Sequence, residues 1–220
     1  MRLANHMPPY RWTEVDGICL PSNLTPNDVC FYYLEYTSHA GYQASDANQW
    51  VFNYKIPADA LRTNPSRQYY KKKAIMEYAN AICHLIPAFK VGQASTPILK
   101  LGNRVGMLPV PPSKAQDDPH YDDRNFQTVT QICSKTGFRL CRDIETISPI
   151  VASHSGGTRN PQTIKQSLGR IVRNANECDW VFLVDDVLVS GAHFVAVSEL
   201  LRETEFTGEI IGLFLARSNS

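Results

Sequence analysis

The run of apolar residues from Trp180 to Val184, which ends in two aspartates, constrains the fold of this chain more than any other feature. The run (WVFLV) is apolar at every position, which indicates a strand buried on both faces, because a half-exposed strand alternates with polar residues. After Asp185 and Asp186 come VLVSGAH and a segment, 192–203, with the apolar spacing of an amphipathic helix. These residues predict a strand, a loop and a helix that belong to a mostly parallel sheet.

Further apolar segments continue this pattern through the second half of the chain. We expect a short strand within 104–112, which is stopped by prolines, and an amphipathic helix near 125–136. We also expect an apolar segment over 147–152, a helical or semi-ordered segment over 162–173 and a buried strand over 209–216. Alternating short strands and helices predict an α/β fold whose sheet is covered on both faces.

The first half of the chain is rich in aromatic residues and prolines. Residues 30–36 (CFYYLEY) and 50–56 (WVFNYKI) predict a pair of strands joined by a long loop. A helix with an apolar stripe is expected to begin near Arg67. Residues 1–29 contain several prolines, and we expect them to wrap irregularly around the rest.

The overall charge is close to zero, with 22 Lys and Arg residues against 21 Asp and Glu residues. This balance argues against a nucleic-acid coat protein, which needs a large basic excess. No apolar run approaches the roughly 20 residues of a membrane span, and the first residues lack the apolar region of a signal peptide. We therefore expect a soluble, cytoplasmic protein that does not contact a membrane.

One stretch, 61–100, is locally basic, with seven Lys and Arg residues against the single acidic residue Glu77. Lys71, Lys72 and Lys73 lie near the start of the expected helix. The stretch is either a solvated helix face or a positive rim for an anionic substrate. A third interpretation is single-stranded nucleic-acid binding, with Tyr69, Tyr70 and Tyr78 as stacking platforms.

The cysteines carry no metal-binding pattern. They are scattered along the chain and form no C-x-x-C pair: Cys19, Cys30, Cys83, Cys133, Cys141 and Cys178. This spacing favours buried free thiols over a zinc site.

The residues after the strand at 180–184 carry the chemistry. In a parallel sheet, ligands bind at the carboxyl ends of the strands. Ser190 and Gly191 lie where the helix begins, and the free N–H groups there suit a phosphate. Asp185 and Asp186 can accept hydrogen bonds from sugar hydroxyls or contact a divalent metal. The expected ligand is a hydroxyl-bearing sugar with a 5′-phosphate.

The same segment resembles the signature of type I phosphoribosyltransferases, an acidic pair followed by V-x-[TS]-[TS]-G-x-T, which binds phosphoribosyl diphosphate (PRPP). Other motifs are similar to those of the competence protein F (ComF) branch. LPVP (108–111) resembles its diphosphate loop, RNFQ (124–127) its R-G-F-N-Q element, and residues 158–174 its flexible loop, with a weaker echo at NYK (53–55). Arg124 either forms an ion pair or points toward the diphosphate. Val189 and His193 replace two hydroxyl residues of the signature, and the cysteines of the branch's zinc ribbon are missing.

The resemblance implies a role for each matching residue. Asp185 and Asp186 would hold the ribose hydroxyls and Mg²⁺. The 5′-phosphate would be bound by Val187, Val189, Ser190, Gly191, Ala192 and His193. The diphosphate would be lined by Pro109, Val110, Pro111, Ser113 and Lys114. A lid over 153–174 would close, and the charge of Arg159, Arg170 or Arg173 would stabilise the departing diphosphate.

The resemblance also implies a fold and an activity. We expect a phosphoribosyltransferase-type core over 91–220 and an N-terminal hood over 1–90. The expected function is Mg²⁺-dependent transfer of ribose 5-phosphate from PRPP to a nitrogenous base. The alternative is a catalytically weakened protein that senses PRPP or a nucleotide, or binds a partner, since folds are reused without their reactions. Either protein is compatible with a homo- or hetero-oligomer.

Overall fold

The protein is built on a six-stranded sheet in the order β1-β2-β8-β7-β3-β4, in which β1 alone runs antiparallel to its neighbour. The computed structural model describes residues 9–17, 19–91, 103–148, 159–172 and 174–219. The strands are β1 (Thr13–Glu14), β2 (Val29–Thr37), β3 (Val105–Pro109), β4 (Arg139–Leu140), β7 (Trp180–Leu188) and β8 (Glu209–Asn219). The expected α/β class with a mostly parallel sheet is confirmed.

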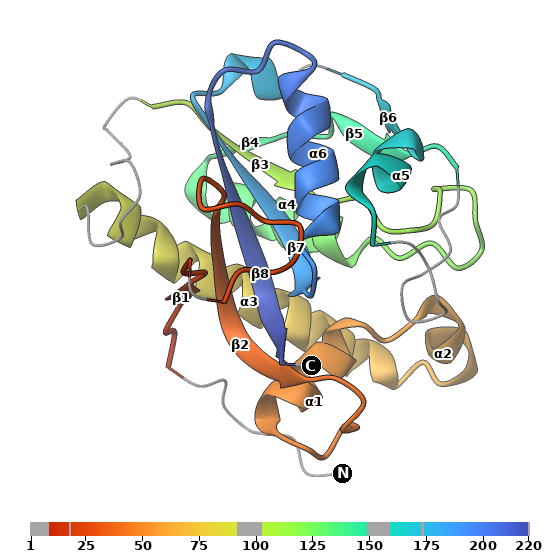
Figure 1. Ribbon diagram of the computed structural model, residues 1–220. Helices are drawn as coiled ribbons and strands as arrows, with labels where there is room; N and C mark the ends of the chain where they lie inside the picture. Colours follow the sequence, from red (N-terminus) through yellow and green to blue (C-terminus); the bar gives the residue numbers. More distant parts are fainter. Residues whose placement is uncertain (1–8, 18, 92–102, 149–158, 173, 220) are drawn as a thin grey trace.

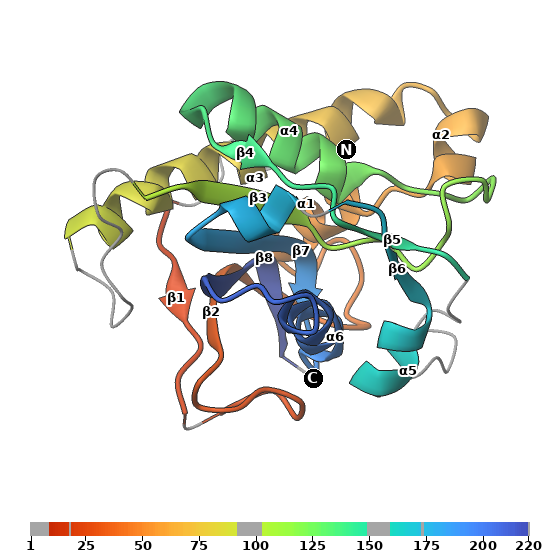
Figure 2. The ribbon, with the colours of Figure 1, turned by 90° about the horizontal axis from the view of Figure 1, so that it is seen from above.

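Helices cover both faces of this sheet (Figure 2). One face carries α1 (Asp46–Tyr54), α3 (Arg67–Val91) and α4 (Arg124–Thr136), and the other carries α6 (Ala192–Arg202). A short helix, α2 (Ala58–Thr63), precedes α3. A smaller unit contains β5 (Ile144–Thr146), α5 (Pro161–Gln166), β6 (Leu168–Arg170) and the 3₁₀ helix η2 (Asn174–Glu177).

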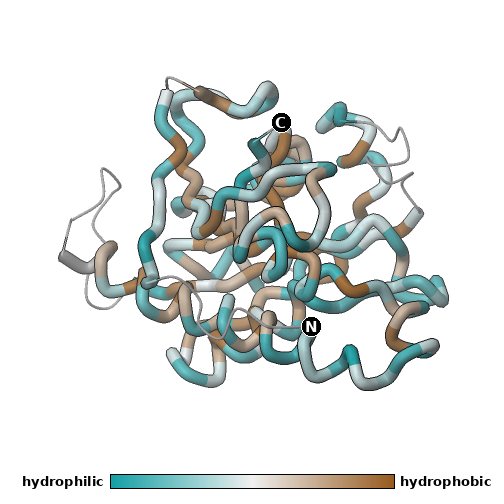
Figure 3. The backbone as a smooth tube through the Cα atoms, turned by 90° about the horizontal axis from the view of Figure 1, so that it is seen from below, coloured by the Kyte–Doolittle hydropathy of each residue, from teal (hydrophilic) through white to brown (hydrophobic). Residues whose placement is uncertain are grey.

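Strand β7 shows why its sequence is apolar throughout. Phe182 and Val184 are buried in the core cluster that also contains residues of α1, α3 and α4, whereas Val181 and Leu183 are buried in the cluster beneath α6. Successive strand residues point to opposite faces, so a strand with cores on both sides needs apolar residues at every position. Apolar segments accordingly lie in the interior and hydrophilic ones along the outer loops (Figure 3).

The order of the strands reverses between β3 and β7. From β3 the chain passes through α4 to β4 on one side, and it later returns to β7 on the other side of β3. Such a switch point opens a crevice at the carboxyl ends of the two strands, where open α/β sheets bind ligands. In this chain those ends carry Pro109 on β3 and the pair Asp185 and Asp186 on β7.

The prediction of a second strand over 50–56 is wrong, because residues 46–54 form helix α1. Ser45 caps this helix by accepting a hydrogen bond from the backbone N–H of Asn48 (3.0 Å). Trp50, Val51 and Tyr54 then fall on one face, where all three are buried. The cap and this helical spacing outweigh the β-propensity of the aromatic residues.

Most other expected elements are confirmed, with shifted bounds. The strand within 30–36 is β2, the helix near Arg67 is α3, and the helix near 125–136 is α4. The segment over 162–173 contains all of α5 after its first residue, and then β6. Of the apolar segment expected over 147–152, residues 149–152 lie outside the described residues.

The N-terminal region contributes to the central sheet. Strand β2, which belongs to the expected hood, pairs in parallel with β8 along most of its length, from Val29 opposite Ile211 to Thr37 opposite Asn219 (Figure 1). Helices α1 and α3 pack in the same core cluster as β7 and β8. The expected division near residue 90 is therefore not a break in the sheet.

Candidate functional site at the carboxyl ends of β3 and β7

Asp185 lies in β7 just past Val184, the last residue of this strand that pairs with β3, and is held by its neighbours. Its Oδ1 atom accepts hydrogen bonds from the side-chain amide of Asn125 (3.1 Å) and from the backbone N–H of Asp186 (2.8 Å). The hydroxyl of Tyr78 on α3 donates to the backbone carbonyl of Asp185 (2.9 Å). Burial and the adjacent charge of Asp186 raise the pKa of the Asp185 carboxyl.

Asp186 is neutralised by two cations. Its Oδ2 atom accepts hydrogen bonds from Nε (3.1 Å) and Nη2 of Arg124 and lies 3.1 Å from Nζ of Lys55. Burial alone would raise the pKa of Asp186, but the charges of Lys55 and Arg124 and their hydrogen bonds hold it well below its ordinary value. The two adjacent carboxyls therefore differ, because Asp186 is kept ionised while Asp185 has an increased affinity for a proton.

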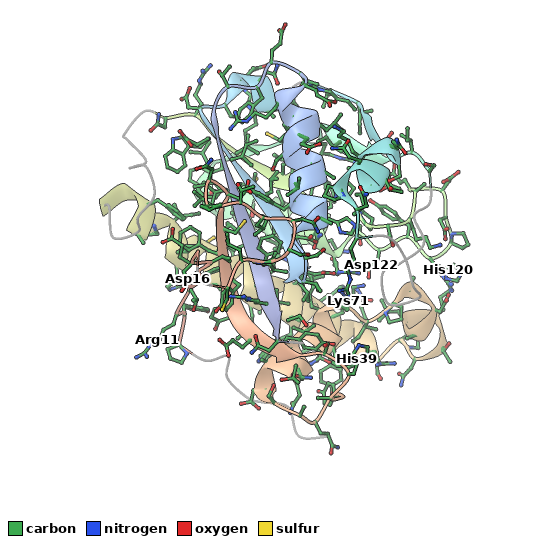
Figure 4. The ribbon with its side chains drawn as sticks, in the orientation of Figure 1. Arg11, Asp16, His39, Lys71, His120 and Asp122 are labelled. Carbon is green, nitrogen blue, oxygen red and sulfur yellow. The ribbon has the colours of Figure 1, made fainter. Side chains whose placement is uncertain are left out.

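The charges continue inward from Asp186 as a chain of alternating sign. Arg124 also contacts Asp122 (Nη1 to Oδ2, 2.6 Å), and Asp122 accepts a hydrogen bond from Lys71 (2.7 Å). Lys71 is only 4% exposed and also donates to the carbonyl oxygen of Ile56 (2.7 Å). Figure 4 labels Lys71 and Asp122, which lie close together. The ion pair expected as one of two roles for Arg124 is thus confirmed.

The basic stretch does not form a uniform positive face. Lys71 is buried and paired, so the interpretation as a solvated face is wrong for this residue. Lys73 lies over the ring of Trp50, with 5.6 Å from Nζ to the ring centroid, and Tyr78 is fully buried. Of the three tyrosines considered as stacking platforms, Tyr69 is well exposed, at 63%. Nucleic-acid binding through this stretch therefore loses Lys71 and Tyr78 as contacts.

The turn between β7 and α6 is where the expected phosphate site lies. Gly191 has a positive φ of 79° and caps α6, whereas Val189 is 42% exposed. Ser190 and Ala192 are buried, and the Ser190 hydroxyl lies 3.4 Å from the backbone nitrogen of Ala192. His193 lies in the first turn of α6, near enough for its charge to lower the pKa of Asp185.

A segment near the N-terminus, Pro21–Leu24, packs against this turn (Figure 1). The backbone N–H of Asn23 donates to the carbonyl oxygen of Ser190 (2.9 Å). A Cβ atom on Gly191 would lie 2.5 Å from Cδ2 of Leu24, so glycine is required there for space as well as for its φ. The prolines in this region indicated only an irregular path, and nothing in its sequence indicated this contact.

The expected diphosphate loop lines a pocket beside the end of β3. Four of its five expected residues contribute to the walls, namely Pro109, Val110, Pro111 and Lys114, whereas Ser113 does not. Asn125 joins this pocket to the acidic pair, because its side-chain amide donates to both Val110 O (3.0 Å) and Asp185 Oδ1 (3.1 Å). One amide thus fixes the ends of β3 and β7 relative to each other.

Arg159 and Arg170, which were expected at the departing diphosphate, are held by other contacts. Arg159 is exposed, and its carbonyl oxygen accepts a hydrogen bond from the Asn23 side chain (3.1 Å). Arg170 is held within the smaller unit by Val172 O and Asn176 Oδ1, each at 3.1 Å. Arg173 and residues 153–158 of the expected lid lie outside the described residues. Among the described residues, Lys55 and Arg124 form the ion pairs with the acidic pair.

No protein-family model matches this chain, and no curated protein does. The phosphoribosyltransferase resemblance therefore rests on the sequence motifs alone. Among the described residues, no group of three or more His, Cys, Asp or Glu side chains could hold a metal ion. None of the helices in the described ranges is long and apolar enough to cross a membrane.

Proposed function

We propose that this protein binds PRPP, or a nucleotide with the same sugar phosphate, at the carboxyl ends of β3 and β7, and transfers its ribose 5-phosphate to a nitrogenous base. The observation that carries the proposal is the pair of hydrogen bonds made by Asn125, which joins the Pro109–Lys114 loop to Asp185 at the strand switch point. A ligand with a diphosphate at one end and ribose hydroxyls beside it would fit this arrangement.

Each part of the ligand has an assigned contact in this proposal. Asp185 offers its carboxylate to the ribose hydroxyls, because its Oδ2 atom receives no hydrogen bond from the described residues. The 5′-phosphate lies at the exposed part of the turn around Val189, and the diphosphate lies along the loop that ends at Lys114. Cations around the diphosphate would stabilise the charge that develops when it leaves.

Lys55 is the residue that has to move. It is 40% exposed, whereas Arg124 is only 17% exposed and is also held by Asp122. When ribose hydroxyls reach Asp186, Lys55 leaves this carboxylate and becomes available to the phosphates of the ligand. Arg124 stays in place and keeps Asp186 ionised, so that it acts as a hydrogen-bond acceptor.

The residues present fit a magnesium ion that arrives with its substrate. Mg²⁺ is usually bound through one or two carboxylates together with substrate phosphates and water. Asp185 can supply one such carboxylate, whereas Asp186 is compensated by Lys55 and Arg124. Mg²⁺ would neutralise the charge of the diphosphate, and the chain would hold the ribose through Asp185 and Asp186.

The second candidate function is the sensing of PRPP or a nucleotide without turnover. Two observations favour it. Asp186 is already occupied by two cations, and the exposed position of the turn is Val189, which has no hydroxyl to offer to a phosphate. Both features reduce the contacts available to a transition state, while the backbone N–H groups of the turn remain to bind a phosphate.

Calorimetry with PRPP and Mg²⁺ tests both candidates, with ribose 5-phosphate as the control ligand that lacks the diphosphate. We expect saturable binding of PRPP that is tighter than that of the control. Diphosphate release is then measured with a panel of purine and pyrimidine bases. Release that depends on the base supports the transferase, and binding without release supports the sensor. Absence of PRPP binding contradicts both.

A further inference from the structure

Cys141 and Cys178 lie on opposite sides of β3 at its start, away from the acidic pair. Cys141 follows β4, and its backbone N–H donates to the carbonyl oxygen of Met107 on β3 (2.9 Å). Cys178 follows η2 and precedes β7, which pairs with β3 on the other side. Both cysteines are buried, at 0% and 5% exposure.

Gly106 lets the two side chains meet. A Cβ atom on this residue of β3 would lie 2.7 Å from Sγ of Cys141 and 2.9 Å from Sγ of Cys178. Because both distances start at the same point, the two sulfur atoms are no more than 5.6 Å apart. Each thiol also lies near a backbone carbonyl oxygen, Cys141 Sγ at 3.9 Å from Arg139 O and Cys178 Sγ at 3.7 Å from Asn174 O. The absence of a side chain on Gly106 therefore creates the space in which the two sulfur atoms face each other.

The segments that carry these thiols are held together by other contacts. The backbone N–H of Ala175 in η2 donates to the buried carboxylate of Asp143 (2.8 Å), two residues after Cys141. Arg139 on β4 forms an ion pair with Glu177 of η2 (2.8 Å). The positions of the cysteines are thus fixed from both sides, so little ordering remains to be achieved when the sulfur atoms bond.

One of the two thiols is the better nucleophile. The neighbouring Cys141 thiol and the charges of Arg139 and Arg104 lower the pKa of Cys178, although burial opposes this shift. The neighbouring Cys178 thiol and burial raise the pKa of Cys141. Arg104 and Glu177 are exposed, so Cys178 lies directly beneath the protein surface.

We propose that Cys141 and Cys178 are a site of reversible oxidation and form a disulfide with a peroxide as the oxidant. The Cys178 thiolate attacks one oxygen of hydrogen peroxide, the O–O bond breaks, and Cys178 becomes a sulfenic acid as the departing hydroxide takes up a proton. The Cys141 sulfur then attacks the sulfenic sulfur, and the hydroxide that leaves takes the Cys141 proton. Two thiols lose two electrons and two protons, and the peroxide is reduced to two water molecules.

The disulfide would tie the two ends of the segment 142–177. This segment supplies Arg142, Ile144, Glu145, Thr146 and Ile171 to the pocket beside the Pro109–Lys114 loop. Closing such a loop covalently restricts the unfolded chain, which stabilises the folded protein. Oxidation would therefore stabilise one wall of this pocket, whatever ligand the pocket takes.

The test uses the reduced full-length protein, treated with hydrogen peroxide, blocked with N-ethylmaleimide and digested without reductant. Mass spectrometry should find one peptide pair joined through Cys141 and Cys178, which separates on reduction with dithiothreitol. Cys141→Ser and Cys178→Ser should each lose the pair. The control Cys30→Ser, which changes another buried thiol, should retain it. Recovery of Cys141 and Cys178 as maleimide adducts, at a dose that oxidises the exposed Cys19, would overturn the proposal.

Thermal unfolding provides a second measurement that does not depend on the folding of a cysteine variant. The oxidised unmutated protein should melt several degrees above its reduced form, and dithiothreitol should reverse the shift. An oxidised form that contains the disulfide but melts at or below the temperature of the reduced form would contradict the stabilising role.

Discussion

The Nζ atom of Lys55 lies 3.1 Å from the Oδ2 atom of Asp186, the same oxygen that accepts two hydrogen bonds from Arg124. The three residues come from the C-terminal cap of α1, the C-terminal half of β7 and the start of α4. Their side chains differ in exposure, at 40% for Lys55, 17% for Arg124 and 12% for Asp186. The pair of Arg124 and Asp186 therefore has a structural role, and Lys55 is the residue of this cluster that a ligand can displace.

Asp186→Asn should destabilise the protein by about 3 kcal/mol, because it leaves the buried guanidinium of Arg124 without one of its two carboxylates. Lys55→Ala, the control, should cost less than about 1 kcal/mol, because exposed ion pairs contribute little. Urea unfolding at pH 7 measures both. Equal effects of the two substitutions would contradict the assignment of Arg124 as the structural partner.

Asp185→Asn should stabilise the protein at pH 7, by about 1 kcal/mol. Asparagine keeps the oxygen that accepts hydrogen bonds from Asn125 and Asp186, and it removes a charge whose burial raises the pKa. The pKa of Asp185 is raised in the folded protein. Its carboxyl therefore contributes to stability below its unfolded-state pKa, near 4, and this contribution is lost as the pH rises through the folded-state pKa. The stability gained by Asp185→Asn should thus disappear near pH 3, which urea unfolding at pH 7 and pH 3 measures. A gain in unfolding free energy that persists at pH 3 would point to a cause other than charge.

The pH dependence of Asp186 should have the opposite sign. Its folded-state pKa is lowered, so its contribution to stability is present above the unfolded pKa, near 4, and is lost as the pH falls through the folded pKa. The difference in unfolding free energy between the unmutated protein and Asp186→Asn should therefore shrink below about pH 4. A difference that is the same at pH 7 and pH 2 would show that the ion pairs do not cause it.

Lys71→Ala should destabilise the protein by about 3 kcal/mol, because it leaves Asp122 buried and without its lysine. The neighbouring Lys72 is exposed, and Lys72→Ala should change stability by less than about 0.5 kcal/mol. Guanidinium unfolding of both variants gives the comparison. If Lys71→Ala were as stable as Lys72→Ala, the chain of charges from Asp186 to Lys71 would have no structural role.

Gly191→Ala should cost more than Gly137→Ala, although both glycines have a positive φ (79° and 73°). A Cβ atom on Gly137 meets nothing within 4 Å, so only the backbone strain of about 1–2 kcal/mol applies. At Gly191 the contact with Leu24 adds an overpacking cost of roughly 1–3 kcal/mol. In a double-mutant cycle, Leu24→Ala should recover part of this added cost. Strict additivity would argue against contact between Pro21–Leu24 and the turn.

The parts of the fold that follow from local pattern were predictable. The apolar run of β7 and the amphipathic spacing of α4 and α6 are one-dimensional signals, and the structure has the corresponding elements. Helix α1 was not predicted, because its aromatic residues favour a strand locally and the helix depends on the Ser45 cap and on packing against the sheet.

The acidic pair of the candidate site and an ion pair of Arg124 were predictable, whereas the parts played by Lys55 and Lys71 were not. The burial of Lys71 could have been predicted from its spacing. It lies three, four and seven residues before Ala74, Ile75 and Tyr78, and thus on the buried face of α3. For Lys55 the sequence offered only the weak motif resemblance at 53–55, because its contact with Asp186 arises from the packing of α1 beside β7. Ion pairs between distant segments depend on tertiary geometry that no local pattern records.

The most direct test of the proposed site is a calorimetric titration of PRPP with Mg²⁺ into the unmutated protein and into Asp185→Asn at pH 7. This variant is expected to be at least as stable as the unmutated protein, so a loss of binding cannot be attributed to unfolding. We predict that its affinity for PRPP is lower by about tenfold or more, the loss expected for a hydrogen bond to a charged group. Equal affinity of the two proteins for PRPP would contradict the placement of the sugar phosphate at the end of β7.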